Sequence, residues 1–260
     1  MDQRRKDTIN DFAHRAYCNL LQDVLPERYT AKADLSRHLR RIFTRYPIDC
    51  VLDVGANEGQ YRNFLRRRCD WHGKIVSFEP VRKNVEYLRS RNGQDPRWRV
   101  MDLALGDQNT QLEINVMENT EFSSFQTPDT KAVPEYANQN RVASKETVQV
   151  RRLDDTIDEL SKDFGFQNFY LKLDTQGFDR NVLEGARGTL DRVPALQTEV
   201  SVLKLYDNAP SYFEMISYLN SLGFEISGLF PVNRDQYERV VEFDCVAVNS
   251  RFFQRVVAST

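Results

Sequence analysis

The first stretch that could do chemistry is a glycine-containing turn after a short apolar run, Val51-Leu52-Asp53-Val54-Gly55-Ala56-Asn57-Glu58-Gly59. Glycine lets a ligand approach the backbone closely, and the helix that follows points its first amides at that ligand. The GxxxG spacing differs from the GxGxxG turn that binds a dinucleotide pyrophosphate. This turn has one glycine fewer than GxGxxG and carries acidic and amide side chains, so it favours a cationic ligand without phosphate. The residues predicted to contact it are Asp53, Gly55, Asn57, Glu58 and Gly59.

A second acidic side chain ends the next apolar run, Ile75-Val76-Ser77-Phe78-Glu79-Pro80, 24 residues beyond Gly55. A carboxylate there can accept hydrogen bonds from both hydroxyls of a ribose, and its charge strengthens such bonds. Pro80 suits the first turn of the following helix. Taken alone, each stretch could be a structural turn or an exposed acid. Together they predict a nucleoside site that includes Glu79 and Pro80.

The third stretch repeats the pattern, since the apolar run 170–173 ends in Asp174 and leads into a glycine-containing turn. Lys172 lies within that run, and Glu199 lies in a further apolar run. In open α/β sheets, ligands bind beyond the carboxyl ends of the strands. We therefore expect Asp174 and Glu199 to share one crevice with the glycine turn and with Glu79.

The elements that must position these residues alternate in type from residue 50 onward. Short runs rich in β-branched residues are separated by stretches with a helical spacing of apolar residues. This alternation predicts a mostly parallel sheet with helices on both faces. Two further strands, 111–117 and 147–152, flank a polar stretch that contains Pro128 and Pro134. The principal strands are expected at 50–54, 74–78, 99–103, 168–173, 195–200, 224–229 and 245–248.

Residues 1–47 are predicted to form a helical N-terminal extension, because apolar residues recur there at three- and four-residue spacing. Pro26 should separate two helices within it. No linker-like composition follows, so we predict one α/β domain over residues 48–260. The extension could shape a substrate site or a homodimer contact.

Composition excludes several classes of protein. The 260-residue chain has a net charge of -2, so no basic field draws it toward nucleic acid or anionic lipid. No apolar run approaches the roughly 18 residues of a membrane helix, and the first residues lead into no secretory signal. Four scattered cysteines without a zinc-binding spacing suit a reducing compartment. We expect a cytoplasmic protein without nucleic-acid binding or stable membrane insertion.

Besides the stretches around Gly55 and Glu79, the chain carries five further motifs: Ala104-Leu105-Gly106-Asp107, Ser123-Ser124-Phe125, Leu153-Asp154, Lys172-Leu173-Asp174-Thr175-Gln176-Gly177 and Glu242-Phe243-Asp244. With these motifs the sequence resembles the FkbM family of S-adenosylmethionine-dependent methyltransferases over residues 49–250. The resemblance implies a class I methyltransferase Rossmann-like α/β fold, with seven strands in the order 3-2-1-4-5-7-6. It also implies S-adenosyl-L-methionine as cofactor, O-methylation of a sugar, glycan or related natural-product hydroxyl, and cofactor contacts that include Ala104 and Ser124.

Methyl transfer to a hydroxyl calls for a base or a metal ion, because a hydroxyl oxygen is a weak nucleophile. The three histidines lie outside the strand-end stretches. Asp174 is therefore the leading catalytic candidate, followed by Glu199 and Lys172. The alternative roles of Asp174 are to cap the next helix or to orient the methionine part of the cofactor. A Mg²⁺ ion would need several oxygen ligands, which Asp174, Asp179 and Glu199 could supply. Many relatives carry a glutamate where this chain has Gln176, and such an acid cannot be the base here.

Two other functional classes stay open. An NAD-dependent oxidoreductase of a sugar or alcohol would use the same glycine turn, although a third glycine and a Tyr-x-x-x-Lys pair are missing. A non-catalytic nucleoside-binding module would need Gly55 and Glu79 but not Asp174. The favoured prediction is a methyltransferase with a small-molecule or glycan acceptor, and the segments around Tyr206 and Asn233 carry the aromatic and polar side chains that sugars favour.

Overall fold

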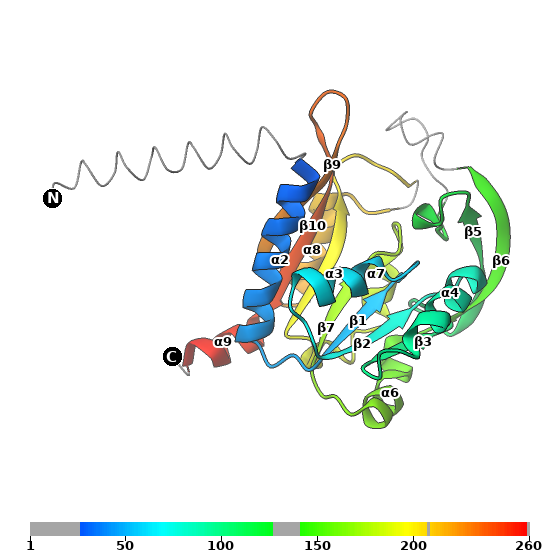
Figure 1. The fold of residues 1–260 in the computed structure, drawn as a ribbon. Helices are drawn as coiled ribbons and strands as arrows, with labels where there is room; N and C mark the ends of the chain where they lie inside the picture. Colours follow the sequence, from blue (N-terminus) through cyan, green and yellow to red (C-terminus); the bar gives the residue numbers. More distant parts are fainter. Residues whose placement is uncertain (1–26, 127–140, 207–208, 259–260) are drawn as a thin grey trace.

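A seven-stranded sheet runs through the computed structural model, which describes residues 27–126, 141–206 and 209–258 (Figure 1). Its strands lie in the order β3-β2-β1-β7-β8-β10-β9, which, counted within this sheet alone, is the predicted 3-2-1-4-5-7-6. Neighbouring strands from β3 to β8 run parallel, and β10 runs antiparallel to both of its neighbours. The bounds are β1 (Cys50–Val54), β2 (Lys74–Phe78), β3 (Trp98–Met101), β7 (Phe169–Leu173), β8 (Ala195–Ser201), β9 (Phe224–Arg234) and β10 (Val240–Asn249).

A smaller sheet, ordered β4-β6-β5, contains the two extra strands predicted in the middle of the chain. It consists of β4 (Ala104–Leu105), β5 (Thr110–Met117) and β6 (Val142–Arg151). Strand β6 begins earlier than the predicted start at 147, because its pairing with β5 continues as far as Met117. The 3-10 helix η1 (Thr120–Phe122) follows β5. Pro128 and Pro134 lie outside the described residues.

Helices cover both faces of the large sheet (Figure 1). Side chains alternate between the faces along each strand, so β1 directs Val51 to one face and Leu52 to the other. The face of Val51 packs against α2 (Glu27–Arg45), α3 (Gln60–Arg68), α4 (Arg82–Asn92) and α9 (Ser250–Ala258). The face of Leu52 packs against α6 (Ile157–Phe164), α7 (Asp179–Glu184), α8 (Tyr212–Ser221) and the 3-10 helices η2 (Leu153–Asp155) and η3 (Leu190–Arg192).

The predicted N-terminal helix is present as α2, whereas Pro26 and the residues before it lie outside the described part of the chain. Leu35, Leu39 and Ile42 of α2 are buried in the same core cluster as residues of β10, and α2 lies along β9 (Figure 1). The helix therefore belongs to the packed body of the protein, while the proposed domain start at residue 48 remains a prediction. None of the described helices is both long and apolar enough to cross a membrane.

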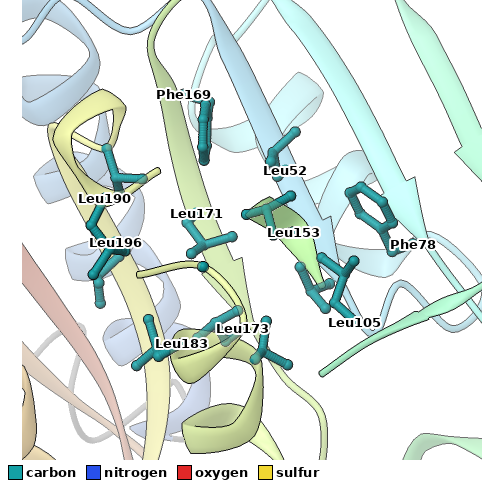
Figure 2. Close-up of a cluster of buried hydrophobic side chains, with 14 of the residues drawn as sticks. Leu52, Phe78, Leu105, Leu153, Phe169, Leu171, Leu173, Leu183, Leu190 and Leu196 are labelled. Atoms are coloured by element: carbon teal, nitrogen blue, oxygen red, sulfur yellow. The ribbon is translucent and has the colours of Figure 1, made fainter. Parts of the chain in front are cut away.

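The apolar cluster beneath the central strands holds the sheet and its helices together. Figure 2 shows Leu52 of β1, Leu171 and Leu173 of β7 and Leu153 of η2 pointing toward one another. All four side chains are almost fully buried. In a core packed this closely, replacing one of these side chains with a smaller one leaves a cavity.

Leu171→Ala should therefore lower the free energy of unfolding by about 2–5 kcal/mol, because the variant loses apolar contacts and leaves a cavity. Urea denaturation followed by circular dichroism would measure the change. Leu229→Ala is a matched control, since Leu229 is 42% exposed, and we expect that change to stay below about 1 kcal/mol. Equal losses in the two variants would contradict this assignment of the core.

Candidate functional site

A cavity of about 330 Å³ opens at the carboxyl ends of β1, β2, β7 and β8. Its lining includes Gly55, Glu79 and Asp174, which directly follow three of these strands, and Glu199 within the fourth. The strand-end residues predicted to meet are therefore brought together in one crevice. They meet because parallel strands present their carboxyl ends at the same edge of the sheet.

The turn after β1 requires glycine because another backbone passes close to it. A Cβ atom on Gly55 would lie 1.9 Å from the carbonyl oxygen of Asp174, and the φ angle of Gly55 is +79°. The N–H groups of Gly55 and Ala56 both donate to the carbonyl of Phe78, at 3.0 and 3.1 Å. The turn is thus held between the ends of β2 and β7, where Gly55, Ala56 and Asn57 line the cavity.

Glu79 is a buried carboxyl group that the protein holds from several sides. Its Oε2 accepts the N–H of Asn57 at 2.7 Å, and its Oε1 accepts the N–H of Val81 at 2.9 Å and the amide of Asn84 at 3.3 Å. Burial raises the pKa of Glu79 to about 7, against the lowering effect of these hydrogen bonds. Among the described residues Oε2 accepts one hydrogen bond, so it retains the capacity to accept a ligand hydroxyl.

The other predicted cofactor contacts divide into two groups. Pro80, Ala104 and Ser124 line the cavity together with the residues described above. Asp53, Glu58 and Gly59 are absent from the lining. Asp53 is buried beneath the cavity floor, and Glu58 is exposed just before α3. Gly59 caps α3, where an added Cβ would meet Leu88 and Trp98.

Lys172 carries a buried positive charge beneath the cavity. Its Nζ lies 3.1 Å from Asp174 Oδ2 and 3.4 Å from Asp53 Oδ1, and it stands over the ring of Tyr61. Burial opposes this charge, but the carboxylates of Asp174 and Asp53 outweigh that effect and raise the pKa of Lys172. The ammonium therefore stays protonated and cannot take a proton from a substrate.

Asp174 and Glu199 are linked by the side-chain amide of Gln176. Its Nε2 donates to Asp174 Oδ1 at 2.9 Å and to Glu199 Oε2 at 3.3 Å. Burial raises the pKa of Glu199 well above its usual range, and the carboxylates of Asp174 and Glu242 add to that shift. The other carboxylate oxygen of Asp174, Oδ2, is paired with the ammonium of Lys172.

Two further carboxyl groups that we had not predicted as site residues come from β10. Glu242 and Asp244 line the cavity, and Asp244 pairs in register with Glu199. Burial raises the pKa of Glu242 to about 7 and that of Asp244 to about 6. The sequence signal was the Glu-Phe-Asp spacing of an alternating strand, which directs two acids to one face. Because β10 is antiparallel, the acids in its N-terminal half lie at the carboxyl edge of the parallel strands.

A second amide holds Asp244 in place. Gln197 Nε2 donates to Asp244 Oδ1 at 2.7 Å. The hydroxyls of Tyr61 and Tyr170 donate to Gln197 Oε1 at 2.8 and 3.2 Å, which fixes the orientation of the amide. Gln197 also lines the cavity and was missing from the predicted site.

Asp179 does not fit the predicted magnesium site. Its Oδ1 accepts the N–H and hydroxyl of Thr175, and its Oδ2 accepts the hydroxyl of Thr198. These bonds occupy both oxygens of the carboxylate at the start of α7, and Asp179 does not line the cavity. Within the described residues no group of three or more His, Cys, Asp or Glu side chains is arranged to hold a metal ion. The structure thus gives the Mg²⁺ prediction no support.

The far end of the cavity is formed by elements outside the strand-end motifs. Lys32 and Leu35 of α2 contribute to its lining, as do Val232 and Asn233 of β9. Lys32 is exposed at this end, whereas Leu35 is buried. The predicted N-terminal helix therefore shapes the cavity, on the side away from the glycine turn.

The sequence matches the family described as methyltransferase FkbM domain over residues 53–226, more than half of the chain. It is also similar to the 2-O-methyltransferase NoeI of Sinorhizobium fredii. The two are 26% identical over 213 residues, which cover 79% of this chain and 81% of that protein.

Two solved structures are similar to this chain at low sequence identity. The methyltransferase FkbM from Methylobacillus flagellatus is 19% identical, with a TM-score of 0.49, and the match covers 77% of this chain but only 43% of that one. An S-adenosylmethionine-dependent methyltransferase from Clostridium acetobutylicum is 9% identical, with a TM-score of 0.46, over 93% of this chain and 99% of that one. From the extent of the domain match, the chain belongs to the FkbM family of S-adenosylmethionine-dependent methyltransferases.

Proposed function

We propose that this methyltransferase modifies a hydroxyl oxygen of a sugar, glycan or related small molecule. The observation that carries the proposal is a single cavity with two chemically different ends. One end is formed by the glycine turn and Glu79, and the other by Glu199, Glu242 and Asp244 with residues of α2 and β9. The similarity to a relative named as a 2-O-methyltransferase supports a hydroxyl acceptor. Because the chain belongs to a methyltransferase family, the alternative function as an NAD-dependent oxidoreductase is set aside.

The end near Glu79 fits the cofactor. Among the described lining residues six are acidic and two are basic, so the cavity favours a cationic sulfonium compound. When bound, S-adenosylmethionine supplies a methyl group that is activated for transfer. We propose that Glu79 accepts the ribose hydroxyls through its remaining capacity. The residues that would hold the rest of the cofactor are Gly55, Asn57, Pro80, Ala104 and Ser124.

The opposite end suits a neutral acceptor with several hydroxyl groups. Glu199, Glu242 and Asp244 offer hydrogen-bond acceptors there, and Asn233 offers both a donor and an acceptor. An anionic acceptor would face like charges at this end. The chemistry of these side chains therefore favours neutral sugars over phosphorylated or carboxylated ones.

Among the three catalytic candidates, we propose Glu199 as the general base. Lys172 is protonated, and Oδ2 of Asp174 is engaged in an ion pair with it. The raised pKa of Glu199 makes its ionised form the stronger base. In the proposed transfer, the acceptor oxygen bonds to the methyl carbon as the carbon–sulfur bond breaks, and Glu199 takes the hydroxyl proton. Asp174 then has a supporting role, which reverses the order expected from the sequence.

Methyl transfer from isotopically labelled S-adenosylmethionine to a panel of sugars would test the acceptor class. We expect labelled neutral mono- or oligosaccharides, and at least tenfold less product from uronic acids or sugar phosphates of the same size, because of the carboxyl groups at the acceptor end. Mass spectrometry would locate the new methyl group. Transfer to amine or thiol compounds alone would contradict a hydroxyl acceptor.

Glu79→Ala should weaken binding of S-adenosylhomocysteine by about 1.5–3 kcal/mol, as expected for loss of charge-assisted hydrogen bonds. Isothermal titration calorimetry would measure the affinity. Glu58→Ala is the matched control, because Glu58 is exposed and does not line the cavity. If Glu79→Ala binds S-adenosylhomocysteine as tightly as the wild type, Glu79 does not contact the cofactor.

Glu199→Gln should reduce turnover by about a hundredfold or more, because the amide cannot take a proton, while affinity for S-adenosylhomocysteine changes little. Wild-type turnover should rise with pH, since the carboxyl must lose its proton first and its pKa is raised. Steady-state rates from pH 6 to 9 would measure both effects, with Glu225→Gln on the exposed edge strand as control. Normal turnover in Glu199→Gln, with loss in Asp174→Asn, would return the role of base to Asp174.

A further inference from the structure

The backbone of Gln176 is held in a conformation that residues with a side chain rarely adopt. Its φ angle is +52°, in the left-handed region. The hydroxyl of Ser124 donates to the carbonyl of Gln176 at 2.6 Å, and also accepts the N–H of Gln126 at 2.9 Å. The bond between Ser124 and Gln176 connects the segment after β5 to the turn after β7. A rare conformation held by such a contact is typical of a functional constraint.

The side chain of Gln176 is oriented by a buried tyrosine. Tyr206 donates its hydroxyl to Gln176 Oε1 at 2.6 Å, and only 2% of Tyr206 is exposed. With Oε1 engaged there, Nε2 must face Asp174 and Glu199, to which it donates. The opposite orientation of the amide would place its oxygen against two carboxyl groups. Tyr206, whose segment carries aromatic and polar side chains of the kind that sugars favour, is absent from the cavity lining.

We propose that Gln176 is a positioning residue that presents both N–H groups of its amide to Asp174 and Glu199, and that Tyr206 fixes its orientation. This inference rests on the proposed roles of the two acids. An amide is a neutral donor, so it holds two carboxyl groups near each other without cancelling their charge. Lys172 donates to Oδ2 of Asp174, while Gln176 donates to Oδ1 of Asp174 and to Glu199. Gln176 therefore links the Lys172–Asp174 ion pair to Glu199.

The proposal predicts a property of Glu199 that needs no acceptor to be measured. A donor to the ionised carboxyl favours the charged form, so loss of the amide should raise the pKa of Glu199 further. The substitutions at Gln176 and Tyr206 leave the identity of the other charged or titratable groups around Glu199 unchanged. These groups are Asp174 and Lys172 of the β7 segment, Asp179 of α7, and Glu242 and Asp244 of β10.

The test is a carbon-13 NMR titration of the Glu199 side-chain carboxyl in full-length protein labelled at glutamate, with the signal assigned by its loss in Glu199→Gln. We expect a higher pKa of Glu199 in Gln176→Leu and, to a smaller degree, in Tyr206→Phe. Tyr212→Phe is the control, since Tyr212 is exposed on α8. An unchanged pKa of Glu199 in both Gln176→Leu and Tyr206→Phe would overturn the proposal.

Turnover gives a second readout once an acceptor is in hand. Tyr206→Phe should lower kcat about three- to tenfold, as for loss of one orienting hydrogen bond, with KM for S-adenosylmethionine unchanged. In Gln176→Glu, the rate relative to wild type should rise as the pH falls, because a protonated glutamate again has a donor. A ratio that does not change with pH would contradict the donor role. If no hydroxyl compound is methylated, the proposed function fails while the titration still decides the role of Gln176.

Discussion

The rest of the site depends on the ion pairs that the buried ammonium of Lys172 forms with Asp53 and Asp174. Strands β1 and β7 pair so that Lys172 lies opposite Asp53, and its Nζ also contacts Asp174 at 3.1 Å. Removal of this cation would leave the fully buried carboxyl of Asp53 without its ion pair, which typically costs about 3–5 kcal/mol. The same charge holds Asp174 at the point where the turn after β7 meets Gly55. One ion-pair network thus joins the two central strands to the floor of the cavity.

Above this cation, neutral donors hold most of the carboxyl groups. The amides of Gln176 and Gln197 and the N–H of Asn57 donate to Glu199, Asp244 and Glu79 respectively. A neutral donor fixes the position of a carboxyl but leaves the negative field in the cavity. That field suits a cationic methyl donor and opposes an anionic acceptor. Burial, and to a smaller degree this field, raises the pKa values of the acids, which makes the ionised form of Glu199 a stronger base.

The sequence by itself determined the sheet and half of the site. Apolar runs that alternate with helical stretches predict a parallel sheet, and acids that end such runs must meet at its carboxyl edge. Glu79 and Asp174 were found in this way because the rule needs only local patterns. The strand order and the cofactor came from the resemblance to the FkbM family, since several topologies are compatible with the same alternation.

Only the tertiary structure decided which polar groups face the cavity and which lie beneath it. Asp53 belongs to the same motif as Gly55, but the pairing of β1 with β7 directs it to Lys172, a residue far along the chain. Glu242 and Asp244 reach the carboxyl edge because β10 runs in the reverse direction, where the rule for parallel strands does not apply. Contacts of this kind depend on packing between distant segments. A local pattern such as the Glu-Phe-Asp spacing shows that two side chains share a face, but not which segment that face meets.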